Sequence, residues 1–239
     1  KNYEMDMCSG PILGKLLTFT IPLIFSGILQ LLFNAADVIV VGRFAGSQSL
    51  AAVGSTTALI NLMINIFIGL SVGVNVIVAR YYGAKREKDV QDTIHTAMAL
   101  SIVSGLFLII LGQLLSRPML ELMGTPDDVI DKSTIYMRII FIGMPANMIY
   151  NFGSAILRAV GDTKRPLYFL TAAGVINVVL NLFFVIMFRM DVAGVSLATA
   201  ISQAISAFLV IRCLMESEGS LKLHLKDLKI HRSKFRQII

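Results

Sequence analysis

Charged side chains are scarce in this chain of 239 residues: only 15% are Asp, Glu, Lys or Arg, whereas 56% are hydrophobic. Soluble domains carry roughly 25% charged residues, so this composition provides too few charges to cover a water-facing surface. Long stretches such as ALINLMINIFIGLSVGVNVIV and ALSIVSGLFLIILGQLL contain no charge at all. Each approaches the roughly 20 residues that cross about 30 Å of hydrocarbon as a helix. The scarcity of charge therefore excludes a soluble fold and predicts an integral membrane protein.

Cysteine is also rare, since the chain contains only Cys8 and Cys213, without the CxxC or Cys/His spacing of a metal site. We expect both to be free thiols. The apolar stretches contain no HExxH, no aspartate pair and no Ser/His dyad, which disfavours an intramembrane enzyme. His95 precedes the third long apolar stretch and is expected to be a solvated helix-end residue. The net charge of +6 does not indicate nucleic-acid binding, because the basic residues lie in the gaps between apolar stretches.

Hydropathy predicts six membrane-spanning helices, at about residues 14–41, 52–79, 94–116, 132–153, 167–188 and 192–214. Helices are expected because a membrane barrel needs short strands of alternating hydrophobicity. Of the 21 Lys and Arg residues, 16 lie near the two ends and in the second and fourth gaps, on one side of the membrane. By the positive-inside rule, we expect a multi-pass protein of the cell membrane with both termini of this segment in the cytoplasm.

The last part of the chain differs in composition from the rest. We divide the chain into a six-helix transmembrane lobe at residues 1–215 and a basic cytoplasmic linker at residues 216–239. The linker alternates Leu or Ile with Lys, His and Arg, and is expected either to lie on anionic lipid headgroups or to be a solvated tail. It ends in KFRQII, similar to the KLLTFTI that leads into the first span, so we expect a second set of helices to follow.

Asp37 is the one ionisable residue predicted to lie deep inside a span, where a charge costs about 2.5–3.5 kcal/mol on insertion scales. It ends a polar stripe of Ser26, Gln30 and Asn34 that lies on one helix face. A structural alternative remains open, in which Asp37 caps the outer helix end or pairs with Arg43 at the interface.

Four further polar stripes at helical spacing occur in other spans: Thr57, Asn61 and Asn65; Asn147, Asn151 and Ser154; Asn177 and Asn181; and Ser196, Thr199, Gln203 and Ser206. One stripe alone is explained by hydrogen bonds between helices, which average about 0.6 kcal/mol each. Because lipid surrounds the bundle, we expect all five stripes to face its interior and to line a wet cavity or a cation site. Pro22 and Pro145 each remove a backbone hydrogen bond inside a span, so we expect a kink at both and a hinge at Pro22.

A specific combination of segments runs through the chain: Pro22, Asp37 followed by VIVVGRFAGSQSLAAVGSTTALI, then LRAVGDTKRPL at residues 157–167, then NVVLN and AGVSLATAISQ. This combination closely resembles the amino-terminal half of the multidrug and toxic compound extrusion (MATE) transporters. The resemblance implies an all-α membrane fold in which six helices form one lobe of a twelve-helix, two-lobe transporter. It also implies efflux of cationic or amphipathic drugs and metabolites in exchange for sodium ions or protons. The expected partners are this small-molecule substrate, the lipid bilayer and the second lobe, with no nucleic acid and no cofactor beyond the coupling ion.

The resemblance further implies a cation site, carried over by position. Asp37 matches the acidic residue of the family's first helix, Asn177 the first polar residue of the fifth and Thr199 the hydroxyl of the sixth, while Val195 offers a backbone carbonyl. Asn181 stands where some members have a second carboxylate, so sodium and proton coupling both remain open. Oxygen ligands at Asp37, Asn177 and Thr199 suit sodium, whereas a lone desolvated carboxylate suits a proton. The expected substrate path follows Gln30, Asn34, Asn61, Asn65, Asn147, Asn151 and Gln203.

Two other functions remain as alternatives. A lipid-linked oligosaccharide flippase shares this architecture, but such proteins usually carry more basic residues in the central cavity, and these spans are nearly free of Lys and Arg. A non-catalytic membrane scaffold would use the polar stripes for packing alone.

Overall fold

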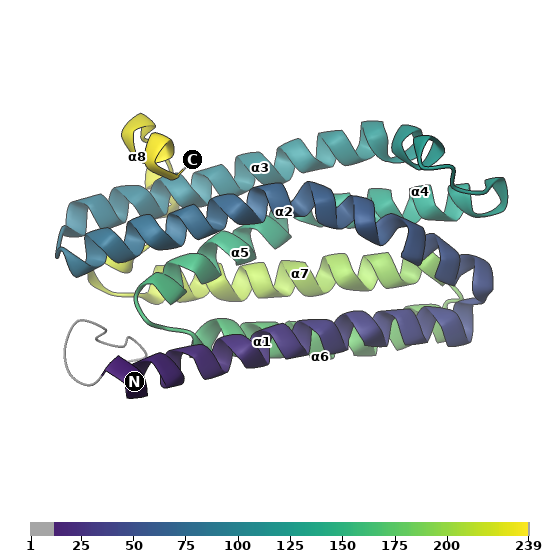
Figure 1. Ribbon diagram of the computed structural model, residues 1–239, viewed down its shortest axis with the longest axis horizontal. Helices are drawn as coiled ribbons and strands as arrows, with labels where there is room; N and C mark the ends of the chain where they lie inside the picture. The colour runs from purple at the N-terminus through teal and green to yellow at the C-terminus, as the bar shows by residue number, and fades with distance from the viewer. Residues whose placement is uncertain (1–11, 239) are drawn as a thin grey trace.

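The computed structural model describes residues 12–238, and over this range the chain is a bundle of long helices without strands (Figure 1). The helices are α1 (Ile12–Val40), α2 (Ser47–Gly83), α3 (Glu87–Leu122), α4 (Asp127–Ile142), α5 (Met144–Ala159), α6 (Lys164–Leu182), α7 (Asp191–Glu216) and α8 (Arg232–Ile238). Two π-helical turns extend α1 and α6, namely η1 (Val41–Ala45) and η2 (Phe183–Met187). Two short 3₁₀ turns, η3 (Gly219–Leu221) and η4 (Leu225–Asp227), follow α7. Cys8 lies outside the described residues.

Five of these helices are long and apolar enough to cross a membrane: α1 with η1, α2, α3, α6 with η2, and α7. The shorter helices α4 and α5 meet at an angle of 47° and together form a sixth, broken span. The sequence-based expectation of an all-helical, multi-pass membrane fold is thereby confirmed.

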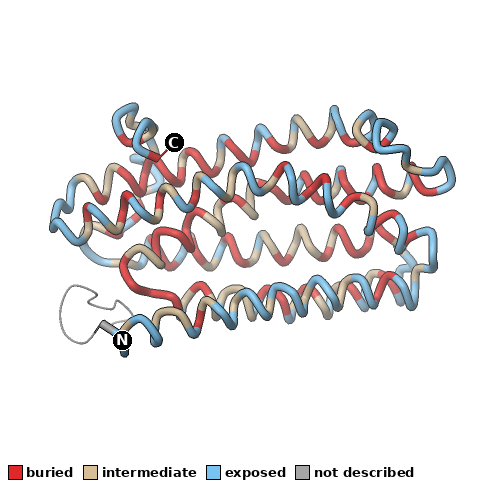
Figure 2. The backbone as a smooth tube through the Cα atoms, viewed as in Figure 1, coloured by how far each residue is buried: buried red, intermediate tan, exposed pale blue. Residues whose placement is uncertain are grey.

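Two helices, α5 and α7, form the centre of the bundle. Helix α5 packs against α2, α3 and α7, and its side chains Met148, Phe152 and Ile156 are completely buried. By contrast, α1 packs mainly against α6, and much of its surface is exposed (Figure 2). Helix α1 is therefore held to the lobe along one side only.

The break in the fourth span lies at Gly143, which separates α4 from α5. A Cβ at this position would lie only 3.1 Å from the Cβ of Ala200 on α7, so a glycine allows the close approach. Pro145 follows in the first turn of α5, where its missing N–H costs little. Pro22 lies inside α1, which continues through this residue as one helix, and the expected kink there stays a prediction.

Helices α3 and α5 come closest at Gly105, where a Cβ would collide with the backbone of Pro145. We expect Gly105→Ala to destabilise the lobe by about 1–3 kcal/mol, as overpacked cores do, despite the better helix propensity of Ala. Gly14→Ala is the matched control, because a Cβ there meets open space. Thermal unfolding of the purified full-length protein should give a lower midpoint for Gly105→Ala only. Equal midpoints for the two variants would contradict this packing.

The segment after α7 packs back onto the bundle. Its residues Leu221, Leu223, Lys234 and Ile238 are buried, and α8 contacts α2 and α3. The interpretation of this segment as a solvated tail is therefore wrong. His95 is also buried rather than solvated, since only 4% of it is exposed beneath this segment.

Candidate functional site

Polar side chains from four helices meet in one cavity between α1, α5, α6 and α7. The cavity measures about 120 Å³, which is room for roughly four waters or a partly hydrated cation at about 30 Å³ per water. Its polar lining consists of Gln30, Asn34, Asp37, Asn147, Tyr150, Asn151, Asn177, Thr199, Ser202, Gln203 and Ser206. Drug-sized ligands occupy pockets of roughly 300–1,000 Å³, so this cavity by itself suits an ion.

A chain of hydrogen bonds links the residues at one end of the cavity. The side-chain amide of Asn181 donates to a carboxylate oxygen of Asp37 and to Oδ1 of Asn177, the latter over 3.2 Å. Asn177 Nδ2 donates in turn to Thr199 Oγ1 over 3.2 Å, and the Thr199 hydroxyl donates to the carbonyl of Val195 over 3.0 Å. The structure thus brings together all five residues to which the resemblance assigns the cation site.

The same network leaves oxygen acceptors without donors. Asn181 is fully buried, yet its Oδ1 atom has no hydrogen-bond partner, and the same holds for the buried Oε1 atom of Gln203. A buried acceptor without a partner costs about 1–3 kcal/mol. The Asn181 Oδ1 atom and the Asp37 carboxylate are oxygens of the kind that a hard cation binds, whereas Gln203 Oε1 lies beside Gly143 at the break between α4 and α5. Among the described residues, no three His, Cys, Asp or Glu side chains cluster in a way that would hold a metal ion.

Asp37 lies within its helix rather than at the end. The helix continues to Val40 and then through η1 to Ala45, which places Asp37 about 12 Å from the end at 1.5 Å per residue. No ion pair to Arg43 or to any other cation in residues 12–238 involves Asp37. A carboxylate also does not stabilise a helix C-terminus, where the helix dipole is negative. The geometry therefore does not support a purely structural role as an outer cap.

The predicted substrate path divides into two groups. Gln30, Asn34, Asn147, Asn151 and Gln203 line the cavity, and Asn151 Nδ2 donates to both oxygens of Asn147 over 2.9 Å. The polar stripe on α2 does not line the cavity, because Thr57, Asn61 and Asn65 are exposed on the outside of the bundle. Within this lobe the α2 stripe therefore does not face the interior, and the buried face of α2 is formed by residues such as Leu59, Ile60 and Met63. The assignment of Asn61 and Asn65 to the substrate path stays a prediction.

Two polar residues that line the cavity were not predicted from the sequence. Tyr150 lies between the cavity and α6, where its hydroxyl donates to the Pro166 carbonyl over 3.0 Å. Ser202 lies one residue before Gln203 and donates to the carbonyl of Thr199. Tyr150 follows Asn147 at a spacing of three, so the helical pattern contained a signal for it.

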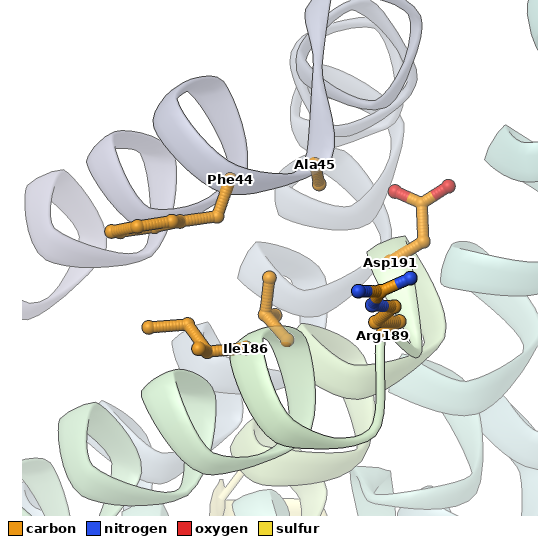
Figure 3. A pocket seen from close by; sticks show the side chains of 6 residues that line it. Phe44, Ala45, Ile186, Arg189 and Asp191 are labelled. Atoms are coloured by element: carbon orange, nitrogen blue, oxygen red, sulfur yellow. The ribbon is translucent and has the colours of Figure 1, made fainter.

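A larger hollow of about 380 Å³ lies at the far end of the lobe from the described start of α1. Figure 3 shows Phe44 and Ala45 from η1 opposite Ile186 of η2, Arg189 of the following loop and Asp191 at the start of α7. Its only carboxylate, Asp191, is paired with Lys132 over 2.7 Å. The charge of this acid is already compensated, so the hollow is the weaker candidate for a cation site.

Comparison with known proteins identifies relatives across most of the chain. The model of the MatE family matches residues 22–183. The "Probable multidrug resistance protein YoeA" of Bacillus subtilis (strain 168) is 34% identical over 197 residues, which cover 81% of this chain and 42% of that protein. "Probable multidrug resistance protein YpnP" of the same organism is 32% identical over 201 residues, and this match covers 84% of this chain and 45% of that protein.

The fold is also similar to that of solved transporter structures. A solved structure described as "Outward-facing conformation of a multidrug resistance MATE family transporter of the MOP superfamily" superposes with a TM-score of 0.86 at 25% identity. The match covers 94% of this chain and 50% of the solved one. The chain therefore spans about half the length of the proteins that it matches.

Proposed function

The chain belongs to the MatE family of membrane transporters, and from this premise we propose that it forms the first six-helix lobe of a secondary active efflux antiporter. Such a transporter exports cationic or amphipathic drugs and metabolites in exchange for sodium ions or protons. It performs no chemical step on its substrate. We place it in the cell membrane.

The observation that carries this proposal is the hydrogen-bonded chain from the half-buried Asp37 through the buried Asn181 and Asn177 to Thr199. A carboxylate in a membrane interior is costly, so its retention beside unpartnered amide oxygens is explained by a cation that neutralises it. Sodium would be held by these oxygens and by the Val195 carbonyl, whereas a proton would be held by Asp37 alone. Sodium and a proton carried on Asp37 would each satisfy unpartnered acceptor oxygens at this site.

Cation binding would act on the contact between α1 and α6. This contact includes the hydrogen bond from Asn181 to Asp37 and the close approach of the Phe33 ring to Gly174. A cation at Asp37 competes with Asn181 for the carboxylate and so changes how firmly α1 is held. Because α1 packs mainly against α6, it is free to move, and we propose Pro22 as the hinge.

A second lobe is needed to complete the substrate path. The cavity in this lobe is too small for a drug-sized molecule, and the polar stripe of Thr57, Asn61 and Asn65 points away from the bundle. The Thr57 hydroxyl donates to the Val53 carbonyl, but contact with lipid would leave the side-chain amides of Asn61 and Asn65 without partners, at several kcal/mol for each unsatisfied group in hydrocarbon. We propose that this face of α2 borders the substrate path between the two lobes, with a second six-helix lobe opposite.

A flippase and a membrane scaffold are the two alternatives to an efflux transporter. No Lys or Arg lines the cavity, and the two Bacillus subtilis relatives reported above are named as probable multidrug resistance proteins, so the flippase is not favoured. Binding of a labelled cationic dye to the purified full-length protein separates a transporter from a scaffold. We expect saturable binding of the dye, and a lack of binding across several dyes would contradict the efflux proposal.

The orientation of the lobe leads to a labelling prediction. Figure 1 shows that α3 and α6 begin at the same end of the bundle as the described part of α1, whereas α4 begins at the opposite end. Lys88, Lys164 and Asp128 are exposed residues in the first turns of α3, α6 and α4. With both termini in the cytoplasm, Lys88→Cys and Lys164→Cys should resist impermeant thiol reagents in intact cells, and Asp128→Cys should react. The background lacks Cys8 and Cys213, and permeabilised cells provide the control in which all three react. Labelling of Lys88→Cys from outside would reverse the orientation.

A further inference from the structure

Residues 217–238, called the linker below, form a docked segment on the outside of α2 and α3 (Figure 1). Leu221, Leu223 and Ile238 are buried in the contact, and the Leu223 N–H donates to the Leu214 carbonyl over 3.0 Å. The Ile238 carbonyl lies where a side chain at Gly73 of α2 would be, so only a glycine permits the approach. The linker is thus fixed at both ends by packing.

Polar contacts hold helix α8, the last part of the linker. Lys234 is only 5% exposed, forms an ion pair with Asp89 and lies 3.9 Å from the centre of the Tyr81 ring. Burial alone would lower the pKa of Lys234, but the hydrogen bonds to Asp89 and Tyr81 raise it above its usual value, so this residue stays charged. Tyr81 also donates to Gln237 Oε1 over 2.7 Å.

Histidine and threonine side chains of α3 provide two further anchors. The Nε2 atom of His95 accepts from the His224 N–H over 3.2 Å, while its Nδ1 atom donates to the Gln91 carbonyl. Thr96 Oγ1 accepts from the His231 N–H over 3.1 Å. These contacts fix the backbone of the linker, and its outward-facing side is therefore a defined surface.

The depth of this surface follows from the residues that it touches. Most of its polar contacts go to the first turns of α3, within residues 89–96 of the polar run EKDVQDTIHT. The uncharged run of α3 begins only at Ala97. The linker therefore lies beside the bundle at the level of the lipid headgroups, on the side of the membrane where α1 begins.

The outer side of the linker is basic. Five cations are exposed there and form no ion pair within the part of the chain that the structure describes: Lys222, Lys226, Lys229, Arg232 and Arg236. Two apolar side chains lie among them, Leu225 with 50% and Ile230 with 43% of their surface exposed. The linker has only two acids, Glu218 and Asp227. Interleaved cations and apolar side chains at headgroup depth match the chemistry of a lipid surface with anionic headgroups.

We propose that the docked linker is a binding surface for anionic phospholipid headgroups of the adjacent leaflet. The cations contact the phosphates, while Leu225 and Ile230 reach the boundary of the acyl chains. The buried face formed by Leu221, Lys234 and Ile238 holds the surface against α2 and α3, so that lipid binding acts on these helices as well as on the linker.

The test uses the full-length protein with a fluorophore on Leu225→Cys, in a background without Cys8 and Cys213. The protein is reconstituted in phosphatidylcholine vesicles that contain an equal fraction of either brominated phosphatidylglycerol or brominated phosphatidylcholine. We expect the anionic lipid to quench the fluorophore more strongly, and added salt to reduce the difference. Replacing Lys226, Lys229 and Arg232 by Gln should abolish the preference, since these exposed side chains are not needed for docking.

The matched control replaces three exposed cations elsewhere at the same end, Lys85, Lys88 and Lys164, by Gln. This variant loses the same charge and should retain the preference. Equal quenching by the two lipids in the parent would overturn the proposal, as would equal loss in both triple variants. Absence of quenching by either lipid would also overturn it, because the surface would then be covered by protein or face water.

Discussion

Replacing Asp37 by Asn is expected to reduce ion-coupled efflux by the full-length transporter to the background of cells without it. Asparagine keeps the size of the side chain and retains an oxygen that accepts from Asn181. It removes the charge that a cation or proton must neutralise, so the cycle loses its coupling step. Folding and membrane insertion should survive or improve, because the variant avoids the cost of about 2.5–3.5 kcal/mol for a buried charge.

The measurement is accumulation of a fluorescent cationic dye in cells that carry parent or variant at matched membrane levels. Asp131→Asn is the control, because this exposed acid pairs only with the exposed Arg117. Dye binding to purified Asp37→Asn should persist, since affinity for an amphipathic compound rests mainly on apolar surface. Efflux at the parental level in Asp37→Asn would mean that coupling does not pass through this carboxylate.

The ligand residues around Asp37 distinguish the two coupling ions. Asn177→Ala and Thr199→Ala each remove an oxygen from the hydrogen-bonded chain. With sodium as the ion, both variants should require a higher sodium concentration for half-maximal efflux. With a proton as the ion, they should change the rate far less than Asp37→Asn does.

Expression of residues 1–239 without the rest of the full-length protein is expected to give no drug resistance above background. The chain spans about half the length of its relatives, its cavity of about 120 Å³ is too small for a drug, and the polar face of α2 is uncovered. A single lobe can insert six spans and fold, yet it lacks the second wall of the substrate path.

Co-expression of the remainder of the full-length protein as a separate chain is the control, and it should restore resistance. Resistance at the full-length level from residues 1–239 alone would contradict the two-lobe account. Cross-linking of that fragment through a cysteine at Asn61 would then reveal whether a second copy replaces the missing lobe.

The local sequence pattern was sufficient to predict much of the fold. Six spans follow from hydropathy, because each apolar stretch must form its backbone hydrogen bonds internally in lipid. The polar stripe that ends at Asp37 and the pair of Asn177 and Asn181 also follow from helical spacing. The structure brings Asp37 and Asn177 into one cavity and bonds Asn181 to Asp37 beside it. Spacing identifies a helix face without identifying its neighbour, which is why Asn61 was assigned to the interior although it is exposed.

The features that were not predicted depend on contacts between distant segments. Docking of the linker rests on Lys234 reaching Asp89, which lies 145 positions earlier in the chain. His95 is buried because His224 covers it, and nothing near His95 in the sequence signals this.

Efflux from reconstituted vesicles tests most directly whether the Asp37 cavity couples ion and substrate movement. The full-length protein is loaded with a cationic dye in vesicles that carry an imposed sodium gradient, or separately a proton gradient. Dye movement should follow at least one gradient in the parent and neither gradient in Asp37→Asn, although the variant still binds the dye. Gradient-driven movement of equal rate in parent and variant would contradict the account and leave Asp37 without a role in coupling.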